Sequence, residues 1–288
     1  GIVATVSNTS ISFGNESTFG SDNASELCAA FHIEQGKCVV AFRNGASSNK
    51  GTAVVGTISG TSISFSSLVV FNTGATSMYT GCMAYDPTSG FERILIGYKD
   101  DGNGDAGTLV VGTVSGTSIS FPQGEDVWDT GNAEVFSVVY DTTANRAVIF
   151  YDDNNDSSKG KAIVAQIATN SDASFGTAVV FNSGATPGAH AGAAFDSASG
   201  KSIVVYMDSG NSTRGTFALG TVDSSNNSIS FSSEVVYETS TSSYNRVCFD
   251  SNLSKCVVAY TFNEASGKSL VVQNAYTSTN LTAENYIG

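Results

Sequence analysis

The chain has 288 residues, with 13 Lys and Arg against 26 Asp and Glu, which gives a formal net charge of −13 at pH 7. This acidic balance, with no basic cluster, excludes nucleic-acid binding, and no apolar run reaches the roughly 18 residues of a membrane span. Two histidines are too few for a multi-histidine metal centre. Charged residues make up only 14% of the chain, so Ser, Thr, Gly and Asn supply most of its polar surface.

One repeat accounts for the predicted elements. Residues 51–65 read GTAVVGTISGTSISF and residues 107–121 read GTLVVGTVSGTSISF, and weaker copies begin at Gly1, Gly160 and Gly215. An aromatic residue followed by a polar one recurs every 54 or 55 residues. A near-constant period of this size in an all-β pattern predicts a β-propeller, in which each copy forms one four-stranded antiparallel blade. The recurring pairs are Phe31-His32, Tyr85-Asp86, Tyr140-Asp141, Phe195-Asp196 and Phe249-Asp250.

In chain order, the elements begin with two outer strands within residues 1–19, and five inner hairpins follow. Both strands of an inner hairpin are continuously apolar, as expected where they pack between neighbouring blades. The two strands after each hairpin alternate Ser or Thr with an apolar residue, which is typical of half-exposed outer strands. The inner hairpins are predicted at residues 26–43, 79–99, 133–153, 188–208 and 243–262.

Five hairpins predict an all-β, five-bladed β-propeller over residues 1–276. Residues 1–19 are expected to complete the blade begun by 243–276, so that pairing of the N- and C-terminal segments closes the ring. Residues 271–276 duplicate the role of 2–6, and which of the two closes the ring stays open. Residues 277–288 leave the repeat and are interpreted as a tail or the start of a linker. A long β-sandwich is the competing architecture, but it does not explain the period.

Each polar residue of the recurring pairs is expected to serve its own hairpin. Asp86, Asp141, Asp196 and Asp250 are each followed by a basic residue, which predicts a cross-hairpin ion pair or an Asx-turn. His32 takes the fifth place and is interpreted as a solvated turn residue. Separately, the chain has five cysteines without a CxxC motif, which predicts buried free thiols rather than disulfides or zinc ligands.

Two loops between second and third strands carry oxygen side chains at alternate positions, which suits Ca²⁺. Neither loop has the full twelve-residue ligand set that ends in Glu, and Asp-Gly and Asn-Gly are also ordinary tight-turn dipeptides. Both interpretations stay open, and no cofactor is required by the sequence. The candidate metal ligands are Asp101, Asn103 and Asp105 in one loop and Asp152, Asn154 and Asp156 in the other.

The blade-to-blade loops place an aromatic ring beside an amide or carboxylate. Such a pair can bind a sugar, because the ring stacks on the C–H face while the polar group bonds hydroxyls. Several weak sites of this kind would act together through avidity. The alternative is that each ring packs between blades. The candidate ligand-binding residues are Phe71, Asn72, Trp128, Asp129, Asn132, Phe181, Asn182 and Tyr237.

The GTAVVGTISGTSISF repeat, the aromatic-Asn/Asp-Thr/Ser-Gly loops and the sequence LTAENYI at residues 281–287 resemble repeats of marine bacteriophage virion proteins, which sit in large tail- or fibre-associated chains. The resemblance covers nearly the whole chain, but its motifs are structural and identify no chemistry. It implies a virion-surface or extracellular location and an adhesion role, with a cell-surface glycan or another virion protein as partner.

The sequence therefore favours a non-catalytic binding or display module. The first alternative is a glycoside hydrolase, which needs two carboxyl groups in separate roles about 5–9.5 Å apart. Its credible acids are those outside the repeat: Glu26, Glu134 and either Glu125 or Asp126. The second alternative is a purely structural spacer between flanking domains.

Overall fold

The computed structural model describes residues 1–20 and 23–272, together with the backbone of residues 283–286. Its strands pair antiparallel, and the remaining regular structure consists of short 3-10 turns. The predicted all-β class is therefore confirmed. Within the described residues, no helix has the length and apolar character needed to cross a bilayer.

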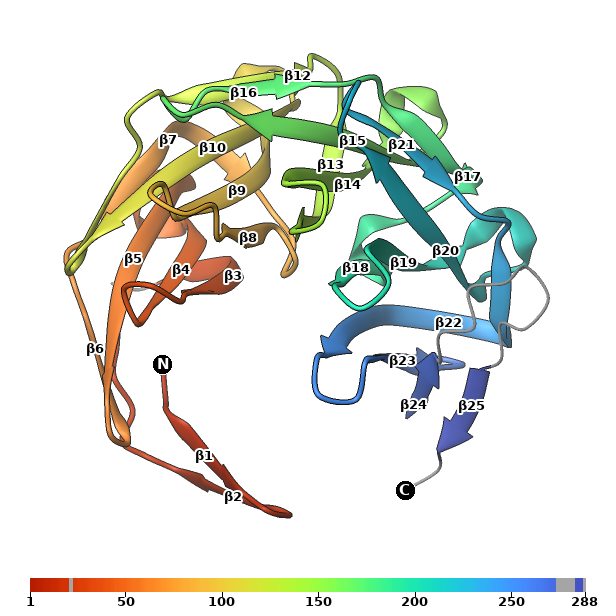
Figure 1. The fold of residues 1–288 in the computed structure, drawn as a ribbon, viewed down its shortest axis with the longest axis horizontal. Coiled ribbons are helices and arrows are strands. Elements are labelled where there is room, and N and C mark those ends of the chain that lie inside the picture. The colour runs from red at the N-terminus through yellow and green to blue at the C-terminus, as the bar shows by residue number, and fades with distance from the viewer. Residues whose placement is uncertain (21–22, 273–282, 287–288) are drawn as a thin grey trace.

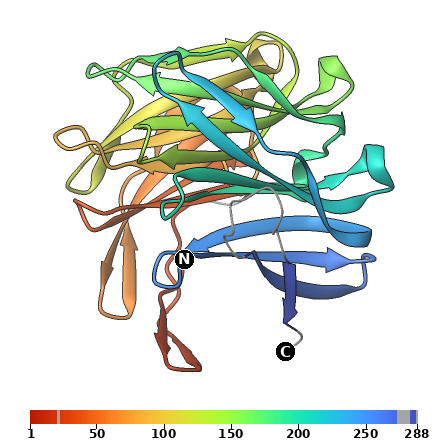
Figure 2. The ribbon, with the colours of Figure 1, turned by 45° about the vertical axis from the view of Figure 1, so that its right-hand side comes forward.

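The strands form five successive units that lie side by side around an open arc (Figure 1). In the first unit, β4 pairs with β3 on one edge and with β5 on the other, and the outer edge of β5 pairs with both β6 and β7. The outer edge is thus formed by two short strands, where the sequence predicted a single fourth strand. Figure 2 shows the same units from a second direction, stacked with their strands running across the arc.

The bounds of the first three units follow from their alternating apolar residues and the Gly, Asn and Asp turns between them. The first unit contains β3 (Ala24–His32), β4 (Lys37–Asn44), β5 (Lys50–Ser59), β6 (Ser62–Phe65) and β7 (Val69–Ser77). The second contains β8 (Met83–Asp86), β9 (Arg93–Asp100), β10 (Ala106–Ser115), β11 (Ser118–Ser120) and β12 (Glu125–Asp129). The third contains β13 (Ala133–Asp141), β14 (Arg146–Asp153), β15 (Lys159–Ile167), β16 (Ala173–Phe175) and β17 (Val179–Ala185).

The last two units share one long strand, β22 (Val235–Asp250), which begins on the outer edge of the fourth unit and ends as the first strand of the fifth. The fourth unit also contains β18 (Ala191–Asp196), β19 (Lys201–Asp208), β20 (Arg214–Asp223) and β21 (Ser228–Phe231). The fifth continues with β23 (Lys255–Phe262), β24 (Ser266–Val272) and β25 (Ala283–Tyr286). The 3-10 turns are η1 (Gly45–Ser47), η2 (Asp101–Asn103), η3 (Asn154–Asp156), η4 (Gly188–His190) and η5 (Ser209–Asn211).

The core lies between consecutive units, because the second strands are buried on both faces. Ile94, Leu95 and Ile96 of β9 are all 0% exposed, as are Val148 and Ile149 of β14. One apolar cluster joins the first three units, a second joins the third and fourth, and a third joins the fourth and fifth. The continuously apolar hairpins of the sequence are thus inner strands, as predicted.

One ring per junction links each unit to the next. The Phe71 ring of β7 packs on Tyr98 of the following unit, with centroids 5.3 Å apart. It also covers Gly51 of its own third strand, where a Cβ atom would clash with the ring. We call these rings the junction aromatics: Phe71, Trp128, Phe181 and Tyr237, which pack on Tyr98, Tyr151, Tyr206 and Tyr260 with centroids 5.3, 6.0, 5.2 and 5.3 Å apart.

The recurring aspartates close the turns of the inner hairpins, as expected. Asp86 accepts a hydrogen bond from the Thr88 N–H at 2.9 Å and forms a buried ion pair with Arg93 at 2.7 Å. Asp141, Asp196 and Asp250 accept equivalent hydrogen bonds from the backbone N–H groups that follow them. The prediction for His32 was wrong. This residue is 1% exposed, because it packs against Tyr85 and its Nε2 lies 3.0 Å from the Glu92 carbonyl oxygen. All five cysteines are free, as predicted, but only Cys28, Cys82 and Cys256 are buried, and the expected burial was wrong for Cys248, which is exposed.

Arg246 crosses from the fifth unit to two earlier ones. Its Nη1 donates to the Ala191 carbonyl at 2.7 Å and its Nε donates to the Thr80 hydroxyl at 3.2 Å. Ala191 belongs to the fourth unit and Thr80 to the second, 166 residues away in sequence. The guanidinium therefore links the fifth unit both to its neighbour, the fourth, and to the second, which is not adjacent to it in the arc.

The two ends of the chain do not pair with each other in the described residues. The strands β1 (Ala4–Ser7) and β2 (Ser10–Phe13) form a hairpin of their own, whereas β24 pairs with β23 and β25. Figure 1 shows the first and fifth units on opposite sides of the opening in the arc. The predicted tail at 277–288 lies mostly outside the described residues. Its described part, β25, extends the last unit instead of leaving the repeat.

Candidate functional site

The second strands bring one residue from each unit to an equivalent place, opposite a glycine that recurs near the start of each third strand. In the first three units this residue is Arg43, Lys99 or Asp152, each paired across the ladder with a glycine. The last two units place Met207 and Thr261 there. The backbone at this position is the same in all five units, but the side chain differs in each. The fold therefore does not require a particular side chain here.

Lys99, one of these residues, lines a cavity of about 150 Å³. Its walls come from three units, and we call it the inner-strand pocket. Glu26 and Glu134, which the sequence singled out as non-repeated acids, both line it. Glu125 and Asp126 do not, because they lie on the outer strand β12. The lining residues are Glu26, Ser77, Met78, Tyr79, Lys99, Glu134 and Val135.

Glu26 is held in the pocket by an irregular strand. The register of β3 against β4 shifts between Ser25 and Cys28, and Glu26 adopts a left-handed backbone with φ of 52°. Its carboxylate accepts from Arg43 Nη1 at 2.8 Å and from the Met78 N–H at 2.9 Å. A bulge re-aims a side chain, and a non-glycine residue at positive φ stores strain that is retained where the side chain is needed.

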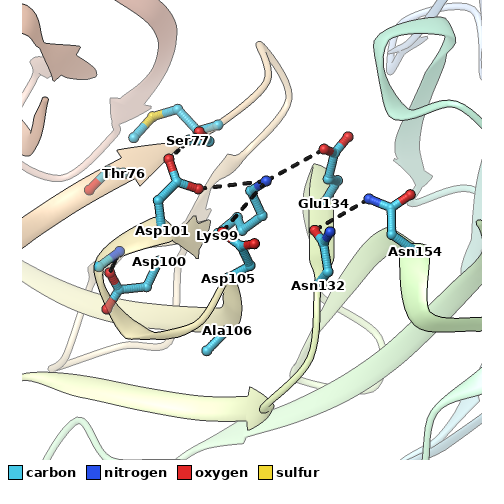
Figure 3. A network of polar contacts seen from close by, with 12 residues as sticks. Thr76, Ser77, Lys99, Asp100, Asp101, Asp105, Ala106, Asn132, Glu134 and Asn154 are labelled. Carbon is cyan, nitrogen blue, oxygen red and sulfur yellow. Dashed lines mark hydrogen bonds and ion pairs between the residues drawn. The ribbon is translucent and has the colours of Figure 1, made fainter.

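Lys99 is the central cation of the site (Figure 3). Its Nζ lies 3.5 Å from Glu134 Oε1, 3.6 Å from Asp101 Oδ1 and 3.9 Å from Asp105 Oδ1. Asp101 also accepts a hydrogen bond from the Ser77 hydroxyl at 2.7 Å. One ammonium group is therefore shared by three carboxylates, so each contact is loose and can be exchanged for a ligand.

Glu134 and Asp152 lie directly opposite each other on β13 and β14. Asp152 is 3% exposed and its Oδ1 has no hydrogen-bond partner. Burial, followed by the nearby Glu134 charge, raises the pKa of Asp152 to about 8. Tyr79 donates its hydroxyl to Glu134 Oε2 at 3.0 Å, and burial together with Glu134 raises the pKa of that phenol well above its usual range. At neutral pH, Asp152 thus keeps its proton beside the Glu134 carboxylate.

The site can therefore offer several kinds of contact to one small polar ligand. Glu26 and Glu134 supply acceptors, Lys99 and the Tyr79 hydroxyl supply donors, and the Tyr79 ring and Met78 supply an apolar wall. Such a mixture of a few polar groups on an apolar lining is the usual composition of a small-molecule site.

Of the residues predicted to bind ligand in the blade-to-blade loops, the aromatic rings pack between units, which is the alternative that the sequence left open. Phe71 and Phe181 are 7% and 6% exposed, and their faces are covered by the neighbouring unit. Asn72 and Asn182 are buried and donate to Thr side chains four residues on, at 3.0 and 2.9 Å. Trp128 and Tyr237 are half-buried in the same kind of packing. Asp129 accepts from the Gly131 N–H at 2.8 Å, and Asn132 accepts from Asn154 at 3.3 Å.

The six predicted metal ligands are not gathered by the fold. The two loops close as the 3-10 turns η2 and η3. Asp101 and Asp105 face Lys99, whereas Asp156 forms ion pairs with Lys159 and Lys161 at 2.8 and 2.9 Å. Asp152 faces Glu134 from a strand, Asn154 bonds Ser158, and Asn103 lies in the turn itself. In the part of the chain that the structure describes, no group of three or more His, Cys, Asp or Glu residues is placed to hold a metal ion.

Sequence reasoning missed Tyr79, Lys99 and Asp152 as members of one site. The signal was present in the repeat, because aligning the units places Arg, Lys, Asp, Met and Thr at one second-strand position. Asp152 was instead grouped with the loop that follows it. A scan against protein-family models and a search of curated proteins found no match to this chain.

Proposed function

We propose that this protein is a non-catalytic carbohydrate-binding module and that the inner-strand pocket binds one sugar residue. The observation that carries the proposal is the gathering of non-repeated polar side chains from three units around one cavity. A sugar matches this lining, because its C–H face can lie against Tyr79 and Met78 while its hydroxyls reach both donors and acceptors.

The charge of the pocket favours a neutral sugar over an anionic ligand. Glu26 is already paired with Arg43, and Lys99 is shared by Glu134 and two aspartates. An added anion would therefore meet carboxylates without an unshared cation to balance it. A neutral polyol needs no counter-charge and can use the carboxylates as acceptors.

We further propose that the five units are blades of a β-propeller and that the protein is displayed extracellularly or on a phage virion. The propeller is supported by the common strand order of the units and by their arrangement around an arc. Virion display is supported only by the resemblance of the repeat. A cell-surface glycan is then the partner. The number of blades and the closure of the ring stay predictions.

A glycan array tests the binding proposal, run with and without Ca²⁺ on the wild type, Glu134→Gln and Glu26→Gln. Loss of a hydrogen bond to a charged group costs about 1.5–3 kcal/mol, so each variant should bind roughly tenfold or more weakly. Glu34→Gln is the matched control, because Glu34 is an exposed turn residue outside the pocket. Wild-type binding that survives both pocket substitutions would contradict the proposal, and an array without any signal would favour the structural spacer.

Glycoside hydrolysis is the second candidate, because Glu26 and Glu134 reach one cavity from different units and a protonated Asp152 lies beside Glu134. A hydrolase needs one carboxyl group as acid and another as nucleophile or base. Incubation with a polysaccharide panel separates the candidates. Turnover that is abolished by Glu134→Gln or Glu26→Gln would establish an enzyme, whereas binding without turnover supports the module.

A further inference from the structure

The N-terminal segment has the structure of half a repeat unit. In β1 and β2, Ala4 lies opposite Phe13 and Val6 opposite Ile11. The first unit has the same register between β5 and β6, where Gly56 lies opposite Phe65. Residues 1–20 therefore align with residues 53–72, which span the second half of a third strand and the outer edge that follows it.

This half-unit packs against the first unit in the position where a preceding unit would lie. Phe19, which aligns with Phe71, is its junction aromatic. Its ring packs edge-on against Phe42 and Phe65, with centroids 5.4 and 5.1 Å apart. Phe71 packs in the same way on Tyr98 and Phe121 of the second unit, at 5.3 and 5.7 Å. Gly14 likewise lies against the Thr61 carbonyl as Gly176 lies against the Asn227 carbonyl.

The inner half of this unit has no counterpart among the described strands. In the first unit, the inner edge of β5 pairs with β4, and Val54 is 0% exposed. The aligned Ile2 is 46% exposed, and β1 pairs only with β2 in the described residues. A cavity of about 330 Å³ opens beneath, lined by residues 1–2, 16–20 and Ala24.

The faces on both sides of the opening in the arc are also uncovered. Leu27 and Phe31 of the first unit are 38% and 50% exposed, whereas the aligned Phe136 and Tyr140 of the third unit are 1% and 9% exposed. On the fifth unit, Leu253 is 67% exposed. Leu253 lies in the turn between β22 and β23. The equivalent turn of the second unit contacts the third unit, because the Thr88 hydroxyl lies 2.8 Å from that of Tyr140.

The fifth unit is not free to supply the missing strands. Its second strand, β23, already pairs with β24 from Cys256 opposite Val272 onward, and β24 pairs with β25. Each of the five inner hairpins in the described residues therefore has its own third strand. The half-unit at the N-terminus requires a sixth hairpin.

We propose that the opening in the arc is the binding place for a sixth inner β-hairpin of the same repeat type, which comes from outside these 288 residues and pairs with the free edge of β1. Its second strand lies against β1 as β4 lies against β5, and its faces cover Phe31 on one side and Leu253 on the other. This proposal concerns assembly and does not depend on the ligand of the inner-strand pocket.

The test supplies such a hairpin by fusing a copy of residues 187–216 ahead of Gly1. Thr216 aligns with Thr52, so Gly1 continues the third strand in register. Amide hydrogen exchange and thermal unfolding are then measured. Exchange at the β1 amides should slow on the order of tenfold or more, as expected for burial of a side chain such as Ile2, and the Tm should rise. The control extension has the same length, with its apolar strand residues replaced by Ser and Thr.

A pair of substitutions distinguishes specific pairing from non-specific contact. Ile2→Asp should abolish the gain in Tm, because Ile2 becomes buried. Val6→Asp should leave the gain intact, because the aligned Ile58 stays 42% exposed even in a complete unit. If the chain with the fused hairpin gains strand content but its β1 amides are not protected from hydrogen exchange, the proposal is overturned.

The unmodified chain gives an independent test that requires no fusion to fold. Because Ile2 and Phe31 are exposed, Ile2→Asp and Phe31→Asp should leave its Tm unchanged, and its β1 amides should exchange fast. Protected β1 amides in a monomer would show that the chain closes on its own fifth unit. Protection that appears only in an oligomer, measured by light scattering, would show that a second copy fills the place. Either result overturns the proposal.

Discussion

The junctions between units and the inner-strand pocket show opposite uses of the same repeat. At each junction an aromatic ring covers a glycine and packs on the next unit, with little change from one unit to another. At the pocket the backbone repeats, but the side chains are Arg43, Lys99 and Asp152 in successive units. Residues that recur in the units thus stabilise the packing between them. Residues that differ between units at an equivalent position serve a role that is confined to one place in the molecule.

The two regions also differ in what they tolerate. The junction asparagines Asn72 and Asn182 are buried with satisfied partners, and the rings of Phe71 and Phe181 are 7% and 6% exposed. The pocket keeps a strained Glu26 with φ of 52° and a buried Asp152 with an unpartnered oxygen. Such features lower stability, and they persist where they serve another purpose. Substitutions at four positions test this contrast, in order of decreasing expected effect.

Phe181→Ala should give the largest loss of stability. The ring is 6% exposed, covers Gly160 and packs on Tyr206, so its removal leaves a cavity in the third junction. We expect a loss of about 3–5 kcal/mol in the free energy of unfolding, measured in urea, with unchanged ligand affinity in the folded protein. A loss of affinity at full stability would place Phe181 in the binding site after all.

Asp152→Asn should stabilise the protein at neutral pH. The folded chain keeps the Asp152 proton up to a pH of about 8, whereas the unfolded chain releases it near the usual aspartate pKa of about 3.9. Wild-type stability therefore falls as the pH rises between these values. The variant should match the wild type below pH ~4 and exceed it increasingly up to pH ~8. Urea unfolding at several pH values measures the difference, and parallel curves would contradict the assignment.

Lys99→Met should raise the pKa of Asp152 above its wild-type value. The Lys99 charge lowers that pKa, although the nearby Glu134 charge raises it and has the larger effect. Carbon NMR titration of the Asp152 carboxyl group measures the change directly. Lys268→Met is the control, because Lys268 pairs with Glu238 in the fifth unit. A pKa that stays the same or falls would show that Lys99 does not face this group.

Glu26→Gly and Glu26→Ala should differ by about 1 kcal/mol in favour of glycine. Both lose the same contacts with Arg43 and Met78, but only glycine adopts the left-handed backbone without strain. Denaturant unfolding of the pair isolates the backbone effect. Equal stabilities would mean that the strand relaxes once the side chain is removed.

The inner hairpins could be predicted well because they depend on local pattern. The hairpin predicted at residues 133–153 matches β13 and β14 in both bounds. Which side chains line the pocket could not be predicted. A strand that is buried on both faces is apolar at every position, so its sequence does not show which face points toward a pocket. The bulge at Glu26 and the turn of Asp152 toward Glu134 depend on register, which the sequence of one strand does not reveal. For the same reason, the sequence left open whether the loop aromatics bind a sugar or pack between blades, and the structure shows them packed on neighbouring units.

Arg246 has a consequence for how the molecule comes apart. Arrays of repeats in which each member contacts only its neighbours behave as one-dimensional chains, and their ends can melt while the middle stays folded. Arg246 violates that rule, because its hydrogen bond to Thr80 links the fifth unit to the second without passing through the third or fourth. Fraying of the last unit must therefore also break this contact with the second unit. This single guanidinium therefore makes unfolding more nearly all-or-none than the linear order of the units would suggest.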